Sequence, residues 1–215
     1  MKKNNFQYRL YGRSKGRKKN NIINSQHIKF QINKLNPSEY NVIDIGSGYG
    51  ESTIEFAKHY KNKKIIACDN YIDGINNIIK LSKINSLENI YIYYGNVHQL
   101  LDECCLPNSI SEIWILFPDP WPKKRHFKRR LIGDFFLNKI KILLKKNASI
   151  HIASDSRSYI SQILCNVHKV KNDFLWVNQS NLEWNYSNLS LPKTKYYKKA
   201  LENGSNPMYL KLIKL

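Results

Sequence analysis

The chain has 215 residues, which is enough for one α/β domain with a substantial core and too few for two domains of that class. It holds 35 Lys and Arg residues but only 16 Asp and Glu residues, and the formal net charge of +19 favours polyanionic partners such as nucleic acid. No run of eighteen apolar residues and no apolar stretch after the N-terminal cations is present, so neither a membrane span nor a secretory signal is predicted, and the cytoplasm is the expected location.

A Lys- and Asn-rich composition is also typical of an AT-rich genome, so only clustered charges bear on function. Cys68, Cys104, Cys105 and Cys165 show no C-x-x-C spacing and mostly lie in apolar segments. We therefore expect buried thiols in a reducing compartment and no metal site. A monomer or a weak homodimer is the expected oligomeric state.

The first acidic residue is Glu39, and residues 1–38 are predicted to form a basic, flexible arm with a lead-in helix before a domain over residues 39–215. Contact with RNA is the predicted role of this arm. A solvated tail without a task and an organellar presequence are the alternatives. The presequence is disfavoured because Lys and Asn predominate over Arg, Ser and Ala.

From Asn41 onward, apolar runs alternate with helical patterns, as in a doubly wound α/β sheet. Strands are predicted over residues 41–45, 64–69, 90–94, 113–117, 149–153, 169–178 and 208–214. Helices are predicted to begin near residues 52, 72 and 97, and to cover residues 130–145 and 156–167. Residues 180–199 are rich in Asn, Ser and Pro and are predicted to be a loop, so the last two strands are expected to form an antiparallel hairpin at one sheet edge.

A glycine loop, Asp44-Ile45-Gly46-Ser47-Gly48-Tyr49-Gly50, connects the first predicted strand to the first helix. Glycines there let the backbone approach a ligand closely. A dinucleotide fingerprint starting at Gly46 requires glycine or alanine at position 51, where this chain has Glu51, so a pyrophosphate would face a carboxylate. The alternative is a turn that only packs a helix onto a strand.

The pattern D-x-G-x-G-x-G resembles the first motif of the S-adenosylmethionine-dependent methyltransferases of Rossmann-like fold. The resemblance implies that Asp44 lies near the methionine part of the cofactor and that the glycines border its adenosyl group. Asp69, at the end of the second strand, would accept hydrogen bonds from the ribose hydroxyls, and Asn96 would lie near the adenine amine. Many members have aspartate where this chain has Asn96, whose carbonyl is still an acceptor.

A proline-rich corner, Phe117-Pro118-Asp119-Pro120-Trp121-Pro122, follows the fourth predicted strand. Its alternating prolines are predicted to hold Phe117, Asp119 and Trp121 in extended conformations. The corner lies at the carboxyl end of a parallel strand, where ligands bind in open α/β sheets. Asp119 can accept hydrogen bonds from a base and favour the positive charge that a methylated purine acquires, whereas Trp121 either stacks on the base or packs the loop.

Cations follow the corner directly, at six of the eight positions from Lys123 to Arg130. A helix start disfavours cations, so this placement suggests an anionic partner. A solvated charge run is the alternative.

The stretch from Phe117 to Arg130, with the arm Tyr11-Gly12-Arg13-Ser14-Lys15-Gly16-Arg17, is similar to the bacterial tRNA (guanine-N7-)-methyltransferases, which methylate a guanine in the variable loop of tRNA. The resemblance implies S-adenosylmethionine as cofactor and tRNA as partner. It implies a cofactor site of Asp44, Gly46, Gly48, Gly50, Asp69, Asn96 and Asp119, with Asp119 also catalytic. Lys123 and Asp155 would contact the substrate, and Arg125, His126, Phe127, Lys128, Arg129 and Arg130 would bind RNA.

Thr194-Lys195-Tyr196-Tyr197 resembles the family motif T-x-[YF]-E, which implies substrate contacts for these four residues. Tyr197 stands where the family has glutamate, and this removes a carboxylate able to hold guanine. Glu183, a short distance upstream, offers another carboxylate. For Asp155, capping of the helix that starts near Ser156 is an equal alternative to substrate contact.

Two other functions compete with this interpretation. Asn96 and Tyr197 are departures that fit a non-catalytic RNA-binding protein on a methyltransferase fold. A methyltransferase acting on protein or DNA amines would more typically carry an (N/D)PP(Y/F) corner without the attached cations.

Overall fold

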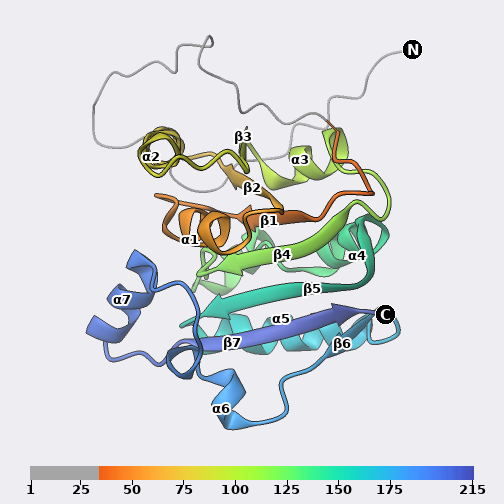
Figure 1. The fold of residues 1–215 in the computed structure, drawn as a ribbon. Coiled ribbons are helices and arrows are strands. Elements are labelled where there is room, and N and C mark those ends of the chain that lie inside the picture. Colours follow the sequence, from red (N-terminus) through yellow and green to blue (C-terminus); the bar gives the residue numbers. More distant parts are fainter. Residues whose placement is uncertain (1–33) are drawn as a thin grey trace.

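The computed structural model describes residues 34–215, drawn in colour in Figure 1. Most of the predicted N-terminal arm lies outside the described residues, so its contact with RNA stays a prediction. Within the described part, one seven-stranded sheet has the order β3-β2-β1-β4-β5-β7-β6.

Five strands of this sheet are parallel: β1 (Asn41–Ile45), β2 (Lys64–Asp69), β3 (Ile90–Tyr94), β4 (Ile110–Leu116) and β5 (Leu144–Ser154). β7 (Met208–Lys214) runs antiparallel to β5, and the edge strand β6 (Phe174–Trp176) runs antiparallel to β7. This confirms the predicted fold class, a mostly parallel Rossmann-like sheet with an antiparallel C-terminal edge hairpin. The strand order reverses between β1 and β4, the place where such sheets bind ligands.

Helices cover both faces of the sheet, as Figure 1 shows. α1 (Glu51–His59), α2 (Ile72–Ile84) and α7 (Lys195–Glu202) pack into one core, and α3 (Val97–Glu103), α4 (Asp134–Leu143) and α5 (Arg157–Lys169) pack into the other. Every residue of the central strands β1 and β4 is buried, which explains their nearly continuous apolar sequences.

The segment predicted as a loop over residues 180–199 is mostly helical, so that prediction was wrong. It contains α6 (Asn181–Trp184), the 3₁₀ helix η3 (Tyr186–Asn188) and the first turns of α7. The polar residues that suggested a loop are helix caps: the side chains of Ser180, Asn185 and Thr194 each accept a hydrogen bond from a backbone N–H two or three residues further on.

Several element boundaries also differ from the sequence prediction, and β4 begins at Ile110 rather than at residue 113. α5 extends to Lys169, so β6 keeps only three of the ten residues predicted for that strand. α4 begins at Asp134 rather than at residue 130, because the 3₁₀ helix η2 (Lys124–Arg129) precedes it. β5 begins at Leu144, which pairs with Ile110 of β4.

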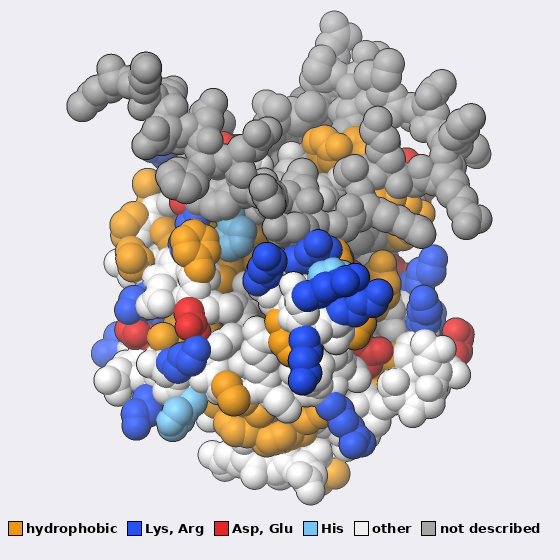
Figure 2. Space-filling model, turned by 180° about the vertical axis from the view of Figure 1, so that it is seen from behind, with side chains coloured by type: hydrophobic (Ala, Val, Ile, Leu, Met, Phe, Trp, Pro, Cys, Tyr) orange, Lys and Arg blue, Asp and Glu red, His pale blue; other side chains and the backbone are white. Residues whose placement is uncertain are grey.

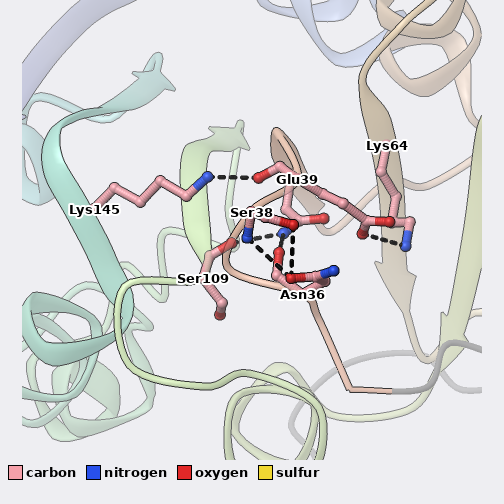
Figure 3. A network of polar contacts seen from close by, with 7 residues as sticks. Asn36, Ser38, Glu39, Lys64, Ser109 and Lys145 are labelled. Carbon is pink, nitrogen blue, oxygen red and sulfur yellow. Dashed lines mark hydrogen bonds and ion pairs between the residues drawn. The ribbon is translucent and has the colours of Figure 1, made fainter.

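The segment before β1 is fixed to the amino edge of the sheet by the polar network in Figure 3. The Asn41 side chain donates to the Asn36 carbonyl at 2.9 Å, the Lys64 ammonium pairs with the Glu39 carboxylate at 2.6 Å, and Lys145 donates to the Glu39 backbone carbonyl. These contacts hold the chain at the edge opposite the glycine loop and the corner.

At the carboxyl edge, Gly74 in the first turn of α2 lets that helix approach the glycine loop. A Cβ at this position would lie 2.0 Å from the backbone oxygen of Gly48, so one of the two segments would have to shift.

We expect Gly74→Ala to destabilise the fold by roughly 1–3 kcal/mol, the usual effect of overpacking. Urea denaturation measures this. Gly133→Ala is the matched control, because no described atom lies within 4 Å of a Cβ there and its φ is −123°. Equal unfolding free energies for the two variants would contradict the assigned contact.

Candidate active site

The glycine loop turns from β1 into α1 through three residues with positive φ: Gly46 at 74°, Gly48 at 53° and Gly50 at 85°. A Cβ at Gly50 would lie 2.2 Å from the side chain of Ile78 in α2, so this glycine is needed for packing. At Gly46 no atom of the described residues lies within 4 Å of the Cβ position. The loop is therefore packed on one side and open at Gly46 to a ligand.

Asp69 fixes the loop from the end of β2. One carboxylate oxygen accepts the Gly48 N–H at 2.7 Å, and the other accepts the Tyr71 N–H at 2.9 Å. Each oxygen keeps a second lone pair for a hydroxyl donor. The acid predicted to hold a ribose is thus oriented before any ligand binds.

Asp44 lies under the loop and is 1% exposed. Burial raises its pKa to about 6, although hydrogen bonds from the hydroxyls of Thr53 (2.6 Å) and Ser52 (2.7 Å) oppose this shift. The nearby charge of Asp69 raises the pKa further.

Asn96 caps α3 through a capping box. Its side-chain oxygen accepts the His98 N–H at 2.8 Å, and the Gln99 side chain accepts the Asn96 N–H at 3.4 Å. The cap fixes the amide at the end of β3, and one lone pair of its oxygen remains for a ligand.

A cavity of 260 Å³ joins these loops to the cationic stretch. Gly46, Asp69 and Asn96 line it from the strand ends, and Lys128 and Arg129 line it from η2. A larger open hollow of 820 Å³ lies at the amino edge beside the starts of β1, β2 and β3. The loops that follow the strands do not line that hollow, so the smaller cavity is the candidate site.

The corner after β4 differs from its predicted geometry. Phe117 and Trp121 have φ values of 55° and 42°, so the prediction of extended conformations was wrong for these two residues. Tertiary contacts overrule the local preference: the Phe117 N–H donates to the Ala153 carbonyl at 2.8 Å, and the Arg129 guanidinium lies 4.9 Å from the Trp121 ring. Such backbone strain costs about 1–3 kcal/mol per residue and is often found at functional sites.

Arg130 holds the corner against α5 and is 5% exposed. Its guanidinium donates to the Pro120 carbonyl (2.7 Å), to the Gln162 side chain (2.6 Å) and to the hydroxyl of Ser158 (2.9 Å), and it lies 3.7 Å from the Phe127 ring. These contacts engage the guanidinium of Arg130, a residue that the sequence predicted to bind RNA. The structure instead supports a structural role for Arg130.

Asp119 is an exposed residue of this corner. The surrounding loop removes part of its hydration, and this effect, followed by the charge of Asp69, raises the pKa of the carboxyl group above its ordinary value. The carboxylates of Asp69 and Asp119 therefore repel each other. Asp44 and Asp69 lie at the carboxyl ends of β1 and β2, and Asp119 follows β4 at the same edge; of the three, Asp69 lines the 260 Å³ cavity.

The remaining cations of the stretch form an exposed cationic block, defined here as residues 123–129. Lys123, Lys124, Arg125 and Lys128 are exposed, whereas His126, Phe127 and Arg129 are partly buried. Figure 2 views the molecule from behind, relative to Figure 1. It shows Lys and Arg side chains gathered around a histidine near the middle of that face. The block borders the 260 Å³ cavity through Lys128 and Arg129.

The other predicted substrate residues lie at the same edge but differ in exposure. Asp155 is exposed after β5, and Ser156, not Asp155, is the cap residue of α5. Lys195 and Tyr196 are also exposed. Tyr197 is buried: its ring packs 5.0 Å from Tyr186, and its hydroxyl donates to Ser187 at 3.0 Å.

One further alternative from the sequence has a structural outcome. The Glu183 carboxylate, a candidate substitute for the missing glutamate, accepts the Gln179 N–H at 2.8 Å at the start of α6. Sequence reasoning did not identify Gly74, although a glycine inside a helical pattern is a recognised signal of close backbone approach.

Within residues 34–215, no group of His, Cys, Asp and Glu has an arrangement suited to a metal ion. Among the same residues, no helix is both long and apolar enough to cross a membrane.

Comparison with known proteins agrees with this geometry. A family model described as "Putative methyltransferase" matches residues 38–210. The tRNA (guanine-N(7)-)-methyltransferase of Buchnera aphidicola subsp. Schizaphis graminum is 31% identical over 174 residues, which cover 81% of this chain and 72% of the relative. The tRNA (guanine-N(7)-)-methyltransferase of Nitrobacter winogradskyi is 30% identical over 175 residues, which cover 81% of this chain and 67% of that relative.

Solved structures show the same fold at low identity. The 16S rRNA methyltransferase KamB has a TM-score of 0.58 at 14% identity, covering 83% of this chain and 90% of that chain. An rRNA methylase from Streptococcus thermophilus has a TM-score of 0.54 at 16% identity, covering 84% and 89%. The family model and the curated relatives, together with this fold, define a methyltransferase of Rossmann-like fold. Within that class, the chain belongs to the tRNA (guanine-N7-)-methyltransferase family.

We expect Arg130→Ala to lower the free energy of unfolding by roughly 2–4 kcal/mol, because several hydrogen bonds of a buried charged group are lost. Arg130→Lys should not restore stability, since an ammonium lacks the planar set of donors. Arg125→Ala, in the exposed block, should change stability by less than about 0.5 kcal/mol. Urea denaturation of the three variants measures these free energies of unfolding. Equal values for Arg130→Ala and Arg125→Ala would contradict the structural role of Arg130.

Proposed function

We propose that this protein transfers a methyl group from S-adenosylmethionine to N7 of a guanine in the variable loop of tRNA. The observation that carries the proposal is the single cavity at which the glycine loop, Asp69 and Asn96 meet the cationic block. The names of the two bacterial relatives support the same reaction.

The residues at this cavity fit the proposed cofactor. Gly46 leaves open space beside its backbone, Asp69 presents oriented acceptors for two ribose hydroxyls, and the Asn96 side chain is fixed where an adenine edge can be recognised. When bound, S-adenosylmethionine supplies an electrophilic methyl group on a positively charged sulfur. The carboxylates of Asp44, Asp69 and Asp119 favour a cationic ligand at this edge.

Positioning is the main task of the protein in this reaction. Guanine N7 carries a lone pair that needs no prior deprotonation, so an oriented base close to the methyl donor is sufficient for attack. Asp119 accepts hydrogen bonds from the base and stabilises the positive charge that develops on the purine. Its raised pKa reflects incomplete hydration, which strengthens such electrostatic interactions.

RNA is held by groups further from the reacting atoms. Lys123 and Asp155 contact the substrate, and the exposed members of the cationic block neutralise phosphates. A cytoplasmic location, where tRNA is present, fits this role. The proposal places the arm, with its many cations, on the same RNA.

We expect Asp119→Asn to reduce methyl transfer to tRNA at least about 100-fold, the usual effect of losing one electrostatic contact to a transition state. Because Asp119 contacts the base and not the phosphates, the Kd for tRNA should change less than about twofold. Transfer of labelled methyl groups and filter binding measure the two quantities.

Glu88→Gln, an exposed carboxylate beside the amino-edge hollow, is the matched control and should match the wild type. Wild-type turnover in Asp119→Asn would exclude the assigned role. A wild-type protein that binds tRNA without any methyl transfer would support the non-catalytic alternative.

The raised pKa of Asp44 predicts a pH dependence of cofactor affinity. Its carboxyl group loses its proton as the pH rises through about 6, and the ionised form attracts the ammonium group of the ligand's amino acid moiety. We therefore expect the affinity for S-adenosylhomocysteine to fall as the pH drops below about 6, and Asp44→Asn to lose this dependence. Calorimetry between pH 5 and pH 8 measures it.

Thermal unfolding of Asp44→Asn at pH 8 checks its fold. Because the folded state holds this proton more tightly than the unfolded state, the stability contribution of Asp44 is present at low pH and is lost as the pH rises through about 6. Removing the charge should therefore not destabilise the protein at pH 8. An unchanged pH dependence of affinity in Asp44→Asn would contradict the assignment.

A further inference from the structure

α7 has one buried side and one basic, aromatic side. Tyr197 and Ala200 are buried in the core, whereas Tyr196 is 59% exposed. Lys195, Lys198 and Lys199 are also exposed, and Glu202, in the last position, is the single acidic residue of the helix. The exposed side of α7 therefore presents one aromatic ring among three positive charges.

The first turn of α7 is attached to the glycine loop. The Lys195 N–H donates to the carboxylate of Glu51, the first residue of α1, and the Lys195 ammonium lies 5.6 Å from the ring centroid of Tyr49. Figure 1 shows α7 beside the carboxyl ends of β4 and β5. The basic side of α7 thus begins at the edge where the candidate active site lies.

Tyr49 is a second aromatic ring on this surface. It is 42% exposed and stands inside the glycine loop, between Gly48 and Gly50. Its hydroxyl lies 2.7 Å from that of Tyr71, their rings pack edge to face at 5.4 Å, and Asn77 donates to its backbone carbonyl at 2.8 Å. Asp73 is the acidic neighbour of Tyr71. These contacts fix the direction of a ring that still faces solvent.

The cationic block lies on the other side of the same edge, because Arg130 ties it to α5 on the sheet face opposite α1 and α7. The candidate active site therefore has a basic surface on each side. The acids on the α7 side are Glu51, which is bonded to Lys195, Glu55 one helical turn later, Asp73 beside Tyr71, and Glu202 at the end of α7.

We propose that Tyr49, Tyr196, Lys195, Lys198 and Lys199, here termed the tyrosine–lysine surface, form a second RNA-contact site that stacks on unpaired nucleotides of the same tRNA. Exposed aromatic rings beside cations are the features with which proteins bind unpaired RNA, since bases stack on the rings and phosphates pair with the cations. The inference rests on the proposed function and extends it from a phosphate contact on one side to a stacking contact on the other.

The surface also gives a role to the altered T-x-[YF]-E motif. Tyr197, at the glutamate position, is buried against Tyr186, so this position offers no carboxylate to a base. The exposed members of the segment are a cation and an aromatic ring. Here the segment holds RNA by stacking and charge.

The stacking contact is tested with Tyr196→Ala and Tyr49→Ala. Loss of one stacked base is expected to raise the KM for tRNA at least about fivefold, more than it lowers kcat. Tyr196→Phe and Tyr49→Phe keep the rings and should restore the wild-type KM. Calorimetry with S-adenosylhomocysteine should give wild-type affinity for all four variants, showing that the glycine loop is intact.

The charge contribution is tested with the double variant Lys198→Gln, Lys199→Gln. Each lost phosphate contact lowers the slope of log Kd for tRNA against log salt by roughly 0.7–0.9. The matched control is Lys146→Gln, Lys171→Gln, which removes two exposed lysines at the amino edge and should leave the slope unchanged.

The outcomes separate the two proposals. A wild-type protein that methylates tRNA, with Tyr→Ala variants whose KM for tRNA is unchanged, would overturn the tyrosine–lysine surface and leave the proposed function intact. Phenylalanine variants with the same raised KM for tRNA as the alanine variants would show that the hydroxyl groups matter and not the rings. This would overturn the stacking contact and favour a role for the Tyr49–Tyr71 hydrogen bond. A wild-type protein that transfers no methyl group to any tRNA would overturn the proposed function itself.

Discussion

The hydrogen bonds of Arg130 are the constraint on which the rest of the edge depends. The corner after β4 contains three prolines and two non-glycine residues with positive φ, a conformation that its own backbone does not favour. The guanidinium joins the Pro120 carbonyl to Ser158 and Gln162 of α5 and so holds the corner in place. As a consequence, Asp119 stands at the edge of the sheet and the cationic block stands beside the cavity.

Charges of both signs lie at the carboxyl edge of the sheet. Asp44, Asp69 and Asp119 lie at the strand ends, and their proximity contributes to the raised pKa values of Asp44 and Asp119. A cationic ligand relieves this repulsion. The exposed lysines and arginines of the cationic block and the exposed lysines of α7 attract a polyanion over roughly 8 Å of screened solution. One site can thus hold a positively charged methyl donor and an RNA.

Most of the fold follows from the sequence because the hydrophobic core determines it. The strand runs and the glycine loop predicted β1 to β4 and the placement of Asp44 and Asp69, since parallel strands are buried on both faces. The C-terminal helices escaped prediction because Ser180, Asn185 and Thr194 are equally typical of loops and of helix caps. The burial of Arg130 and Tyr197 depends on partners in distant segments, which local patterns do not specify. The roles of the site residues remain predictions.

The proposed reaction requires one cavity at the sheet edge to bring the methyl donor and a tRNA guanine together. The most direct measurement incubates the protein with an unmodified tRNA transcript and methyl-labelled S-adenosylmethionine, digests the RNA and identifies the labelled nucleoside. We expect 7-methylguanosine from the variable loop, and no labelled nucleoside when that guanine is replaced by adenine. Label in a different nucleoside, or RNA without label, would contradict it.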